Sequence, residues 1–94
     1  MNKADLVKKV SERTSIPSSA AKVIVTTIFD EMRVSLEKGE RIEIRGFGSF
    51  VTRNYGAYRG RNPKTGAVVD VAPKKLPHFK VGRELKELVN KEQA

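Results

Sequence analysis

The chain has 94 residues, of which 32% are charged and 38% hydrophobic, and its 19 Lys and Arg exceed its 11 Asp and Glu to give a net charge of +8. Cysteine is absent, which excludes a disulfide framework, a thiolate nucleophile and a cysteine-ligated metal. A domain of this size buries only about 60–65% of its unfolded surface, so we expect a dimer, and the positive charge indicates a polyanionic partner or surface.

Two helices are predicted in the first forty residues. Residues 2–13 have a plausible N-cap in Asn2, and Pro17 disfavours helix at the residue before it. A longer helix then runs from Ser18 or Ser19 to Lys38, and Gly39 fits its C-terminal stop. The apolar positions that recur at helical spacing are Leu6, Val7 and Val10 in the first helix, and Ala21, Ile24 or Val25, Ile28, Phe29, Met32 and Leu36 in the second.

The hydrophobic period changes to that of strands after Gly39. Residues 40–45 alternate polar and apolar side chains, and the glycine-rich Gly46–Phe50 segment turns the chain into a second strand that ends near Tyr55. Pro77–Val81 predicts a short third strand. Gly82 begins a predicted final helix with Leu85, Leu88 and Val89 on one face.

Residues 53–74 are predicted to form a long β-hairpin. Positions 52–75 contain six Lys or Arg and a single acid, Asp70, and residues 67–71 read as its returning strand. Asn62–Thr65 suits a type I turn with proline second, and Gly66 suits a left-handed position after it. A hairpin with so little apolar content is either disordered alone or covered by a partner, and its charge indicates an anionic one.

Sites for catalysis, nucleotides or metals are not supported. Gly46 and Gly48 would need a glycine at Val51 for the dinucleotide fingerprint, and the order in Lys64–Gly66 reverses that of a phosphate loop. His78 is the only histidine, and neither a paired carboxylate site nor a base for a Ser or Thr nucleophile is visible. We therefore expect no enzyme activity, no cofactor, no metal and no small-molecule substrate.

The tip of the hairpin has the chemistry of a minor-groove reader. Arg and Asn recognise acceptors and groove width in the DNA minor groove, and an apolar proline can wedge between stacked base pairs. Arg59, Arg61 and Asn62 precede Pro63 closely, so these four residues are the predicted reading tip. Arg53 and Lys64 flank that tip and would lie near phosphates.

Two other interpretations stay open for the hairpin. It could be a solvated loop whose charges only keep the protein soluble. It could also belong to an RNA-binding module, although such modules rely on aromatic stacking surfaces and only Tyr55 and Tyr58 are candidates here. These two tyrosines could stack on ribose or simply stiffen the ribbon.

Three motifs together resemble the HU/integration host factor family of bacterial nucleoid proteins. They are Gly46–Phe50, Gly60–Gly66 and Pro77–Lys80, the last followed by Gly82 and the Leu85–Lys86 pair, in the family's order and spacing. The resemblance covers essentially all of residues 1–94. It implies a cytoplasmic, nucleoid-associated protein that bends double-stranded DNA in support of recombination, replication and transcription control.

The fold that the resemblance implies is an α+β intertwined dimer. Each chain would contribute two N-terminal helices to a helical base, a three-stranded antiparallel sheet, a long β-hairpin arm and a C-terminal helix. The implied divisions of this single domain are 1–39 for dimerisation, 40–52 and 75–81 for the saddle strands, 53–74 for the DNA-binding arm and 82–92 for the C-terminal helix.

The resemblance also assigns roles residue by residue. Pro63 inherits intercalation at the arm tip. The minor-groove set is Arg45, Arg53, Arg59, Arg61, Asn62 and Lys64; the DNA-backbone set is Lys3, Gly46, Ser49, Lys75, Lys80, Arg83 and Lys86; and the dimer core is Phe29, Phe47, Phe50 and Phe79.

Within the family, Gly39–Phe50 is most similar to the β subunit of integration host factor. Arg45 matches an arginine that the β subunit uses for sequence preference, with Glu43 nearby to orient it, whereas HU chains usually carry an apolar residue there. The alternative for Arg45 is a non-specific phosphate contact. The sequence leaves open a heterodimer with an α-type subunit or an HU-like homodimer that compacts DNA without specificity.

Overall fold

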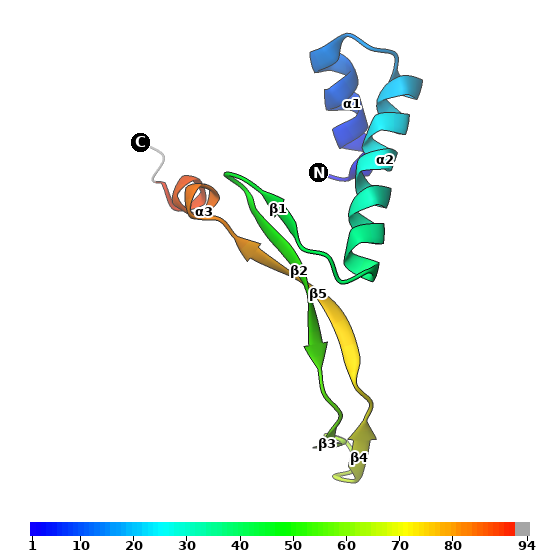
Figure 1. Cartoon of the computed structure of the whole chain (residues 1–94), viewed down its shortest axis with the longest axis vertical. Helices are drawn as coiled ribbons and strands as arrows, with labels where there is room; N and C mark the ends of the chain where they lie inside the picture. Colours follow the sequence, from blue (N-terminus) through cyan, green and yellow to red (C-terminus); the bar gives the residue numbers. More distant parts are fainter. Residues whose placement is uncertain (92–94) are drawn as a thin grey trace. The chain divides into compact units, whose positions relative to one another are not determined.

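The computed structural model describes residues 1–91 of the chain. Contacts between residues divide the chain into two compact units, Met1–Ser35 and Leu36–Ala94, which we describe separately. Along the described residues the elements are two helices, five strands and a final helix, as labelled in Figure 1. This arrangement confirms the α+β class predicted from the sequence.

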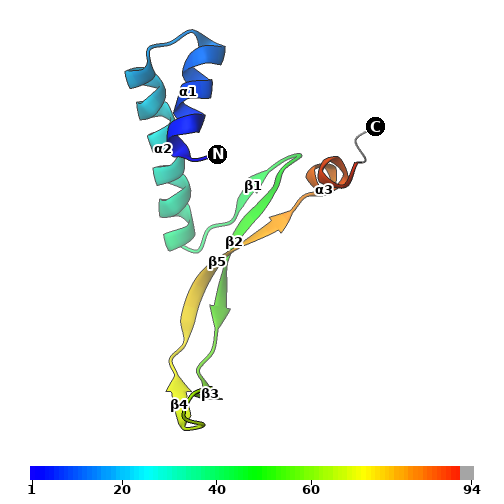
Figure 2. The ribbon, with the colours of Figure 1, turned by 180° about the vertical axis from the view of Figure 1, so that it is seen from behind.

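The first unit is a helical hairpin built from α1 (Lys3–Thr14) and most of α2 (Ser18–Glu37). The two helices lie side by side in both Figure 1 and Figure 2. Asn2 is the N-cap of α1, as predicted: its side chain accepts from the Asp5 backbone N–H at 2.9 Å, and the Asp5 carboxylate accepts from the Asn2 N–H at 3.0 Å. This reciprocal pair satisfies donors that have no partner inside the helix.

The core of a single chain is very small. Among the described residues only Ala21 and Val25, one turn apart on α2, are buried hydrophobic side chains. Other apolar residues of α2, including Val23 at 66% and Ile28 at 54%, remain exposed. One chain therefore leaves much of its apolar surface uncovered, as the expectation of a dimer requires.

The second unit contains a three-stranded antiparallel sheet with the order β1-β2-β5. Its strands are β1 (Ile42–Ile44), β2 (Gly48–Tyr55) and β5 (Lys74–Val81). The Thr52 hydroxyl of β2 donates to the Leu36 carbonyl of the last turn of α2 at 2.8 Å. Because the last carbonyls of a helix have no partner within it, this bond both satisfies one of them and joins the helix end to the sheet.

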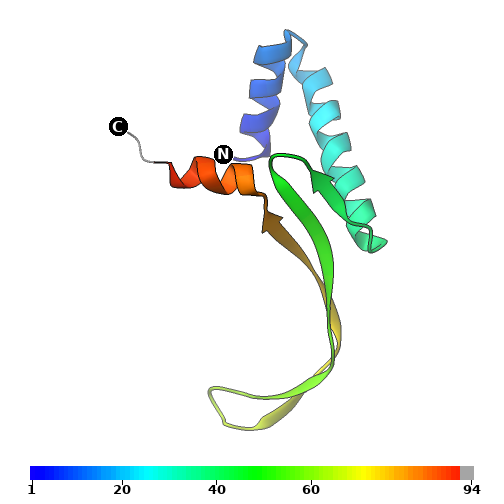
Figure 3. The same ribbon diagram turned by 60° about the vertical axis from the view of Figure 1, so that its left-hand side comes forward.

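A second ladder of two strands, β3 (Tyr58–Arg61) and β4 (Val68–Val71), completes the arm. In Figure 3 the two sides of the arm run together and bend along their length to the tip. The inner ladder ends at the Tyr55–Lys74 pair and the outer ladder resumes at the Tyr58–Val71 pair. Two residues on each side are therefore unpaired, and the register is the same beyond the gap as before it.

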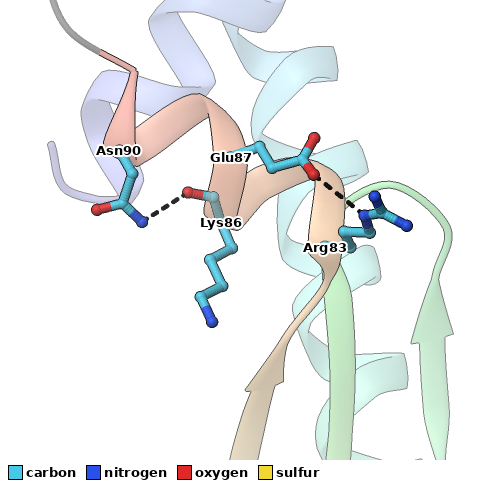
Figure 4. A network of polar contacts seen from close by, with 4 residues as sticks. All are labelled: Arg83, Lys86, Glu87 and Asn90. Atoms are coloured by element: carbon cyan, nitrogen blue, oxygen red, sulfur yellow. Dashed lines mark hydrogen bonds and ion pairs between the residues drawn. The ribbon is translucent and has the colours of Figure 1, made fainter.

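The final helix α3 (Arg83–Asn90) follows β5 directly. Gly82 is its N-cap, and the Gly82 N–H donates to the Phe47 carbonyl at 2.9 Å. Arg83 and Glu87 form an ion pair along the helix at 3.0 Å, and the Asn90 side chain donates to the Lys86 carbonyl at 2.9 Å (Figure 4). These contacts fix the start of α3 against the turn between β1 and β2.

Three element boundaries differ from the sequence expectation. The third strand of the sheet begins at Lys74 rather than at Pro77, because β2 extends to Tyr55 and needs a partner along its whole length. Pro77 is accommodated because β5 is an edge strand within the chain, where a missing N–H is tolerated. Gly82 caps the final helix rather than beginning it, and the helix ends at Asn90; the predicted end at residue 92 lies outside the described residues.

Two classes of site are absent from the described part of the chain. No helix there has the length and apolar character required to cross a membrane. Residues 1–91 also hold no group of three or more His, Cys, Asp or Glu side chains that could ligate a metal ion.

Candidate nucleic-acid interface

The tip of the arm is a four-residue loop closed by backbone bonds. The Asn62 N–H donates to the Ala67 carbonyl at 2.8 Å, and the Gly66 N–H donates to the Asn62 carbonyl at 2.7 Å. Gly66 adopts φ +71°, the left-handed conformation predicted for it, where a side chain would be strained. Pro63 is exposed in this loop and, having no N–H, leaves no donor unsatisfied there.

Asn62 has a second task that the sequence interpretation missed. Its side-chain oxygen accepts from the Lys64 N–H at 2.9 Å, which is the local bond of an Asx turn. The amide oxygen is therefore engaged inside the loop, and the NH₂ group is what remains to contact an acceptor on DNA. The pattern Asn-Pro could have suggested this turn, because Asn and Asp make such bonds to the backbone two residues later.

The arm presents two chemically different faces. Side chains alternate between faces along a strand, and residues opposite each other in the register share a face. Arg59 and Arg61 of β3 therefore lie on one face with their partners Asp70 and Val68. The other face of this ladder carries Tyr58, Gly60, Val69 and Val71.

Tyr58 belongs to the apolar face of the arm. A Cβ built on Gly60 would lie 3.6 Å from the Tyr58 ring and 3.9 Å from a Val71 methyl group, so the ring leans over the glycine beside the valine. Aromatic cover of this kind stabilises a strand that contains glycine. Of the two roles left open for Tyr58, the contacts therefore favour stiffening the ribbon.

The turn between β1 and β2 holds three of the predicted DNA contacts. Gly46 adopts φ +84°, and a Cβ there would lie 2.9 Å from the Glu84 carboxylate, so this position suits glycine. Ser49 accepts a hydrogen bond from the Arg41 guanidinium at 3.2 Å. Arg45 is exposed, and within the described residues no hydrogen bond or ion pair joins it to Glu43.

Ser49 and Lys80 are directly opposite each other in the register, so they share one face of the sheet. The neighbouring Phe50 and Phe79 pair is also opposite and therefore occupies the other face. The sheet thus separates polar candidate contacts from aromatic packing.

Three of the four predicted core phenylalanines form one cluster. Phe79 lies between Phe50 and Phe47, with ring centroids 4.8 and 5.4 Å apart, at tilted angles that favour aromatic pairs. Phe47 and Phe79 are still 43% and 38% exposed, so the cluster is only partly covered by its own chain. Phe29 lies on α2 in the first unit, where it is 47% exposed.

The remaining basic residues of the predicted interface are distributed over several elements. Arg53 and Lys75 lie on the inner ladder of the arm, and Arg83 and Lys86 lie on α3 (Figure 4). Arg83 is engaged with Glu87, as described above. Lys3 starts α1 in the first unit, apart from the group in the second unit.

The family model described as "Bacterial DNA-binding protein" matches residues 1–90. The chain is 43% identical over 89 residues to the DNA-binding protein HU-1 of Halalkalibacterium halodurans, covering 95% of this chain and 99% of that protein. It is 45% identical over 94 residues to the integration host factor subunit beta of Pseudoalteromonas atlantica, covering 98% of this chain and 97% of that protein.

The solved structures that resemble this chain belong to the same group of proteins. The Anabaena HU chain from an HU–DNA cocrystal structure superposes with a TM-score of 0.87 at 32% identity, covering 98% of this chain and all of that one. HU from Thermotoga maritima has a TM-score of 0.65 at 30% identity, with coverage of 96% and 100%. The match over nearly the whole chain, in sequence and in fold, shows that this protein belongs to the family of bacterial DNA-binding proteins.

Proposed function

We propose that this chain forms a dimer that binds double-stranded DNA and bends it, as an architectural, nucleoid-associated protein of the cytoplasm without catalytic activity. The observation that carries the proposal is the arm. It projects beyond the sheet as a hairpin whose positions 52–75 hold six Lys or Arg and one acid. Its resemblance to an HU chain crystallised with DNA supports duplex DNA as its partner.

The arm tip is the proposed wedge. Pro63 would insert between base pairs from the minor groove, while Arg59, Arg61 and the Asn62 amide contact groove acceptors and Arg53 and Lys64 approach phosphates. Unstacking costs about a few kcal/mol per step, and smooth bending of a 20–30 bp site costs about 1–6 kcal/mol. Contacts of a longer wrapped DNA with the protein offset these costs.

The body of the protein would hold the DNA that leaves each wedge. Cationic side chains that neutralise phosphates release counterions, so affinity falls with salt by a slope of about 0.9 per phosphate. The proposed body contacts are Lys3, Gly46, Ser49, Lys75, Lys80, Arg83 and Lys86, with Arg45 as the residue for sequence preference. We keep the division into a helical dimerisation part at 1–39, saddle strands, the arm at 53–74 and a C-terminal helix.

The dimer is supported by the apolar surface that one chain leaves open. Ala21 and Val25 are too small a core for an independent domain, while Phe29 of α2 and the Phe47–Phe79 pair remain substantially exposed. We propose that a second chain covers these residues. Similar identities to HU-1 and to the β subunit of integration host factor support either a homodimer or a heterodimer with an α-type chain.

Energy transfer between dyes at the two ends of a duplex of about 30 base pairs tests the proposal. Wild type and Pro63→Ala are compared, with Pro73→Ala as a matched control because it removes a proline from the same arm away from the tip. We expect all three to bind and Pro63→Ala alone to bend the duplex less. Unchanged bending by Pro63→Ala would refute the wedge mechanism.

The same experiment examines the alternatives. Duplex RNA that competes as well as duplex DNA would favour an RNA-binding module. A purified single chain that neither dimerises nor bends DNA, and does both when mixed with an α-type chain, would identify a heterodimer subunit. A homodimer that bends DNA without preference for sequence would place the chain with HU.

A further inference from the structure

The face of the arm that carries Arg59 and Arg61 also carries an acid. Asp70 lies directly opposite Arg59 in the β3–β4 ladder, and the Arg59 Nε is 3.3 Å from an Asp70 carboxylate oxygen. Asp70 is the single acid among positions 52–75. A negative charge therefore sits on the side of the ribbon where two of the arm's arginines are found.

This arginine-bearing face is the one free to meet DNA. On the opposite face the Tyr58 ring leans over Gly60 beside Val71, so those side chains serve the ribbon itself. The side chains of Arg59 and Asp70 are 80% and 84% exposed, so nothing in the chain covers the pair. DNA bound along this face would meet both charges at once.

The stability of the arm does not account for the pair. An exposed ion pair contributes only about 0–1 kcal/mol, and a carboxylate placed beside phosphates opposes binding through like-charge repulsion. The carboxylate also competes with phosphate for the guanidinium. Because a guanidinium has five donors, Arg59 can keep its contact with Asp70 through Nε and still donate to another acceptor.

We propose that Asp70 is a positioning residue that holds the Arg59 guanidinium on the ribbon and prevents it from binding DNA phosphates as an independent cation. This inference rests on the proposed function, since it concerns how the arm meets duplex DNA. Asp70 weakens the sequence-independent attraction of the arm for phosphates. The DNA affinity of the arm then depends more on groove geometry and on the tip.

Asp70→Asn tests the proposal because it keeps the size of the side chain and removes its charge. Each arm that gains one phosphate contact through the released Arg59 should bind roughly eightfold more tightly at 0.1 M salt, with a salt slope steeper by about 0.9. Fluorescence anisotropy with a labelled duplex at several salt concentrations measures both quantities. Asp30→Asn, which removes an exposed acid of α2 outside the arm, serves as the charge control and should change affinity less.

A double-mutant cycle decides whether Asp70 acts through Arg59. In an Arg59→Gln background, Asp70→Asn should lose most of its effect on affinity and on the salt slope. An unchanged slope in Asp70→Asn, or a full gain that persists without Arg59, would overturn the inference while leaving the proposed function intact. Wild type that shows no salt-dependent binding to duplex DNA would instead overturn the proposed function, and this inference with it.

Discussion

Gly48 is the position where a single methyl group should do the most damage to the sheet. It is buried at the start of β2, and a Cβ built there would lie 2.6 Å from the Lys80 carbonyl oxygen and 2.6 Å from two carbons of the Phe79 ring. Both neighbours are constrained, the carbonyl by β5 and the ring by Phe47 and Phe50. Something must therefore move by most of an ångström.

We expect Gly48→Ala to lower the free energy of unfolding by about 1–3 kcal/mol, the usual cost of overpacking. Urea unfolding followed by circular dichroism, at several protein concentrations because a dimer's stability depends on concentration, measures the change. Gly56→Ala is the matched control: nothing lies within 4 Å of its added Cβ and its φ is not positive, so stability should stay the same or rise slightly. Equal stability of Gly48→Ala and wild type would refute the packing described for β2, β5 and the phenylalanines.

Two further substitutions test contacts at the ends of the helices. Asn2→Ala removes the acceptor for the Asp5 N–H and should cost about 1 kcal/mol, with Asn2→Asp restoring most of it; thermal unfolding compares the three proteins, and no loss in Asn2→Ala would show that the cap contributes nothing. Thr52→Val removes the donor to the Leu36 carbonyl, and should cost about 0.5–1.5 kcal/mol. Urea titration checks it, and a Thr52→Ser variant that is no more stable than Thr52→Val would contradict the role of the hydroxyl.

The helices and the arm tip could be predicted from local patterns. The N-cap at Asn2 and the left-handed turn at Gly66 depend on neighbouring residues alone, so the sequence contains their whole cause. The start of β5 could not be predicted in this way. Lys74 to Leu76 have no strand pattern of their own and are held in the sheet by β2.

The pairs on the arm lie between these cases. Once the turn at 62–67 is placed, counting back along both strands sets Arg59 opposite Asp70, so the hairpin prediction already contained that pair. The gap at 56–57 and 72–73 was not visible, because Gly56 and Pro73 oppose each other only when the register is known. The roles of the interface residues came from family resemblance, and local chemistry alone supported only the group around Pro63.

The gap in the arm has a consequence for how arms of different length can arise. Because the register is the same on both sides of the gap, adding one residue to each strand there would preserve pairing but turn Arg59 and Arg61 to the face opposite Arg53. Adding two residues to each strand would restore the facing and lengthen the arm by about 6–7 Å. The reach of this arm can therefore change in steps of two residue pairs without reversing the surface that it offers to its partner.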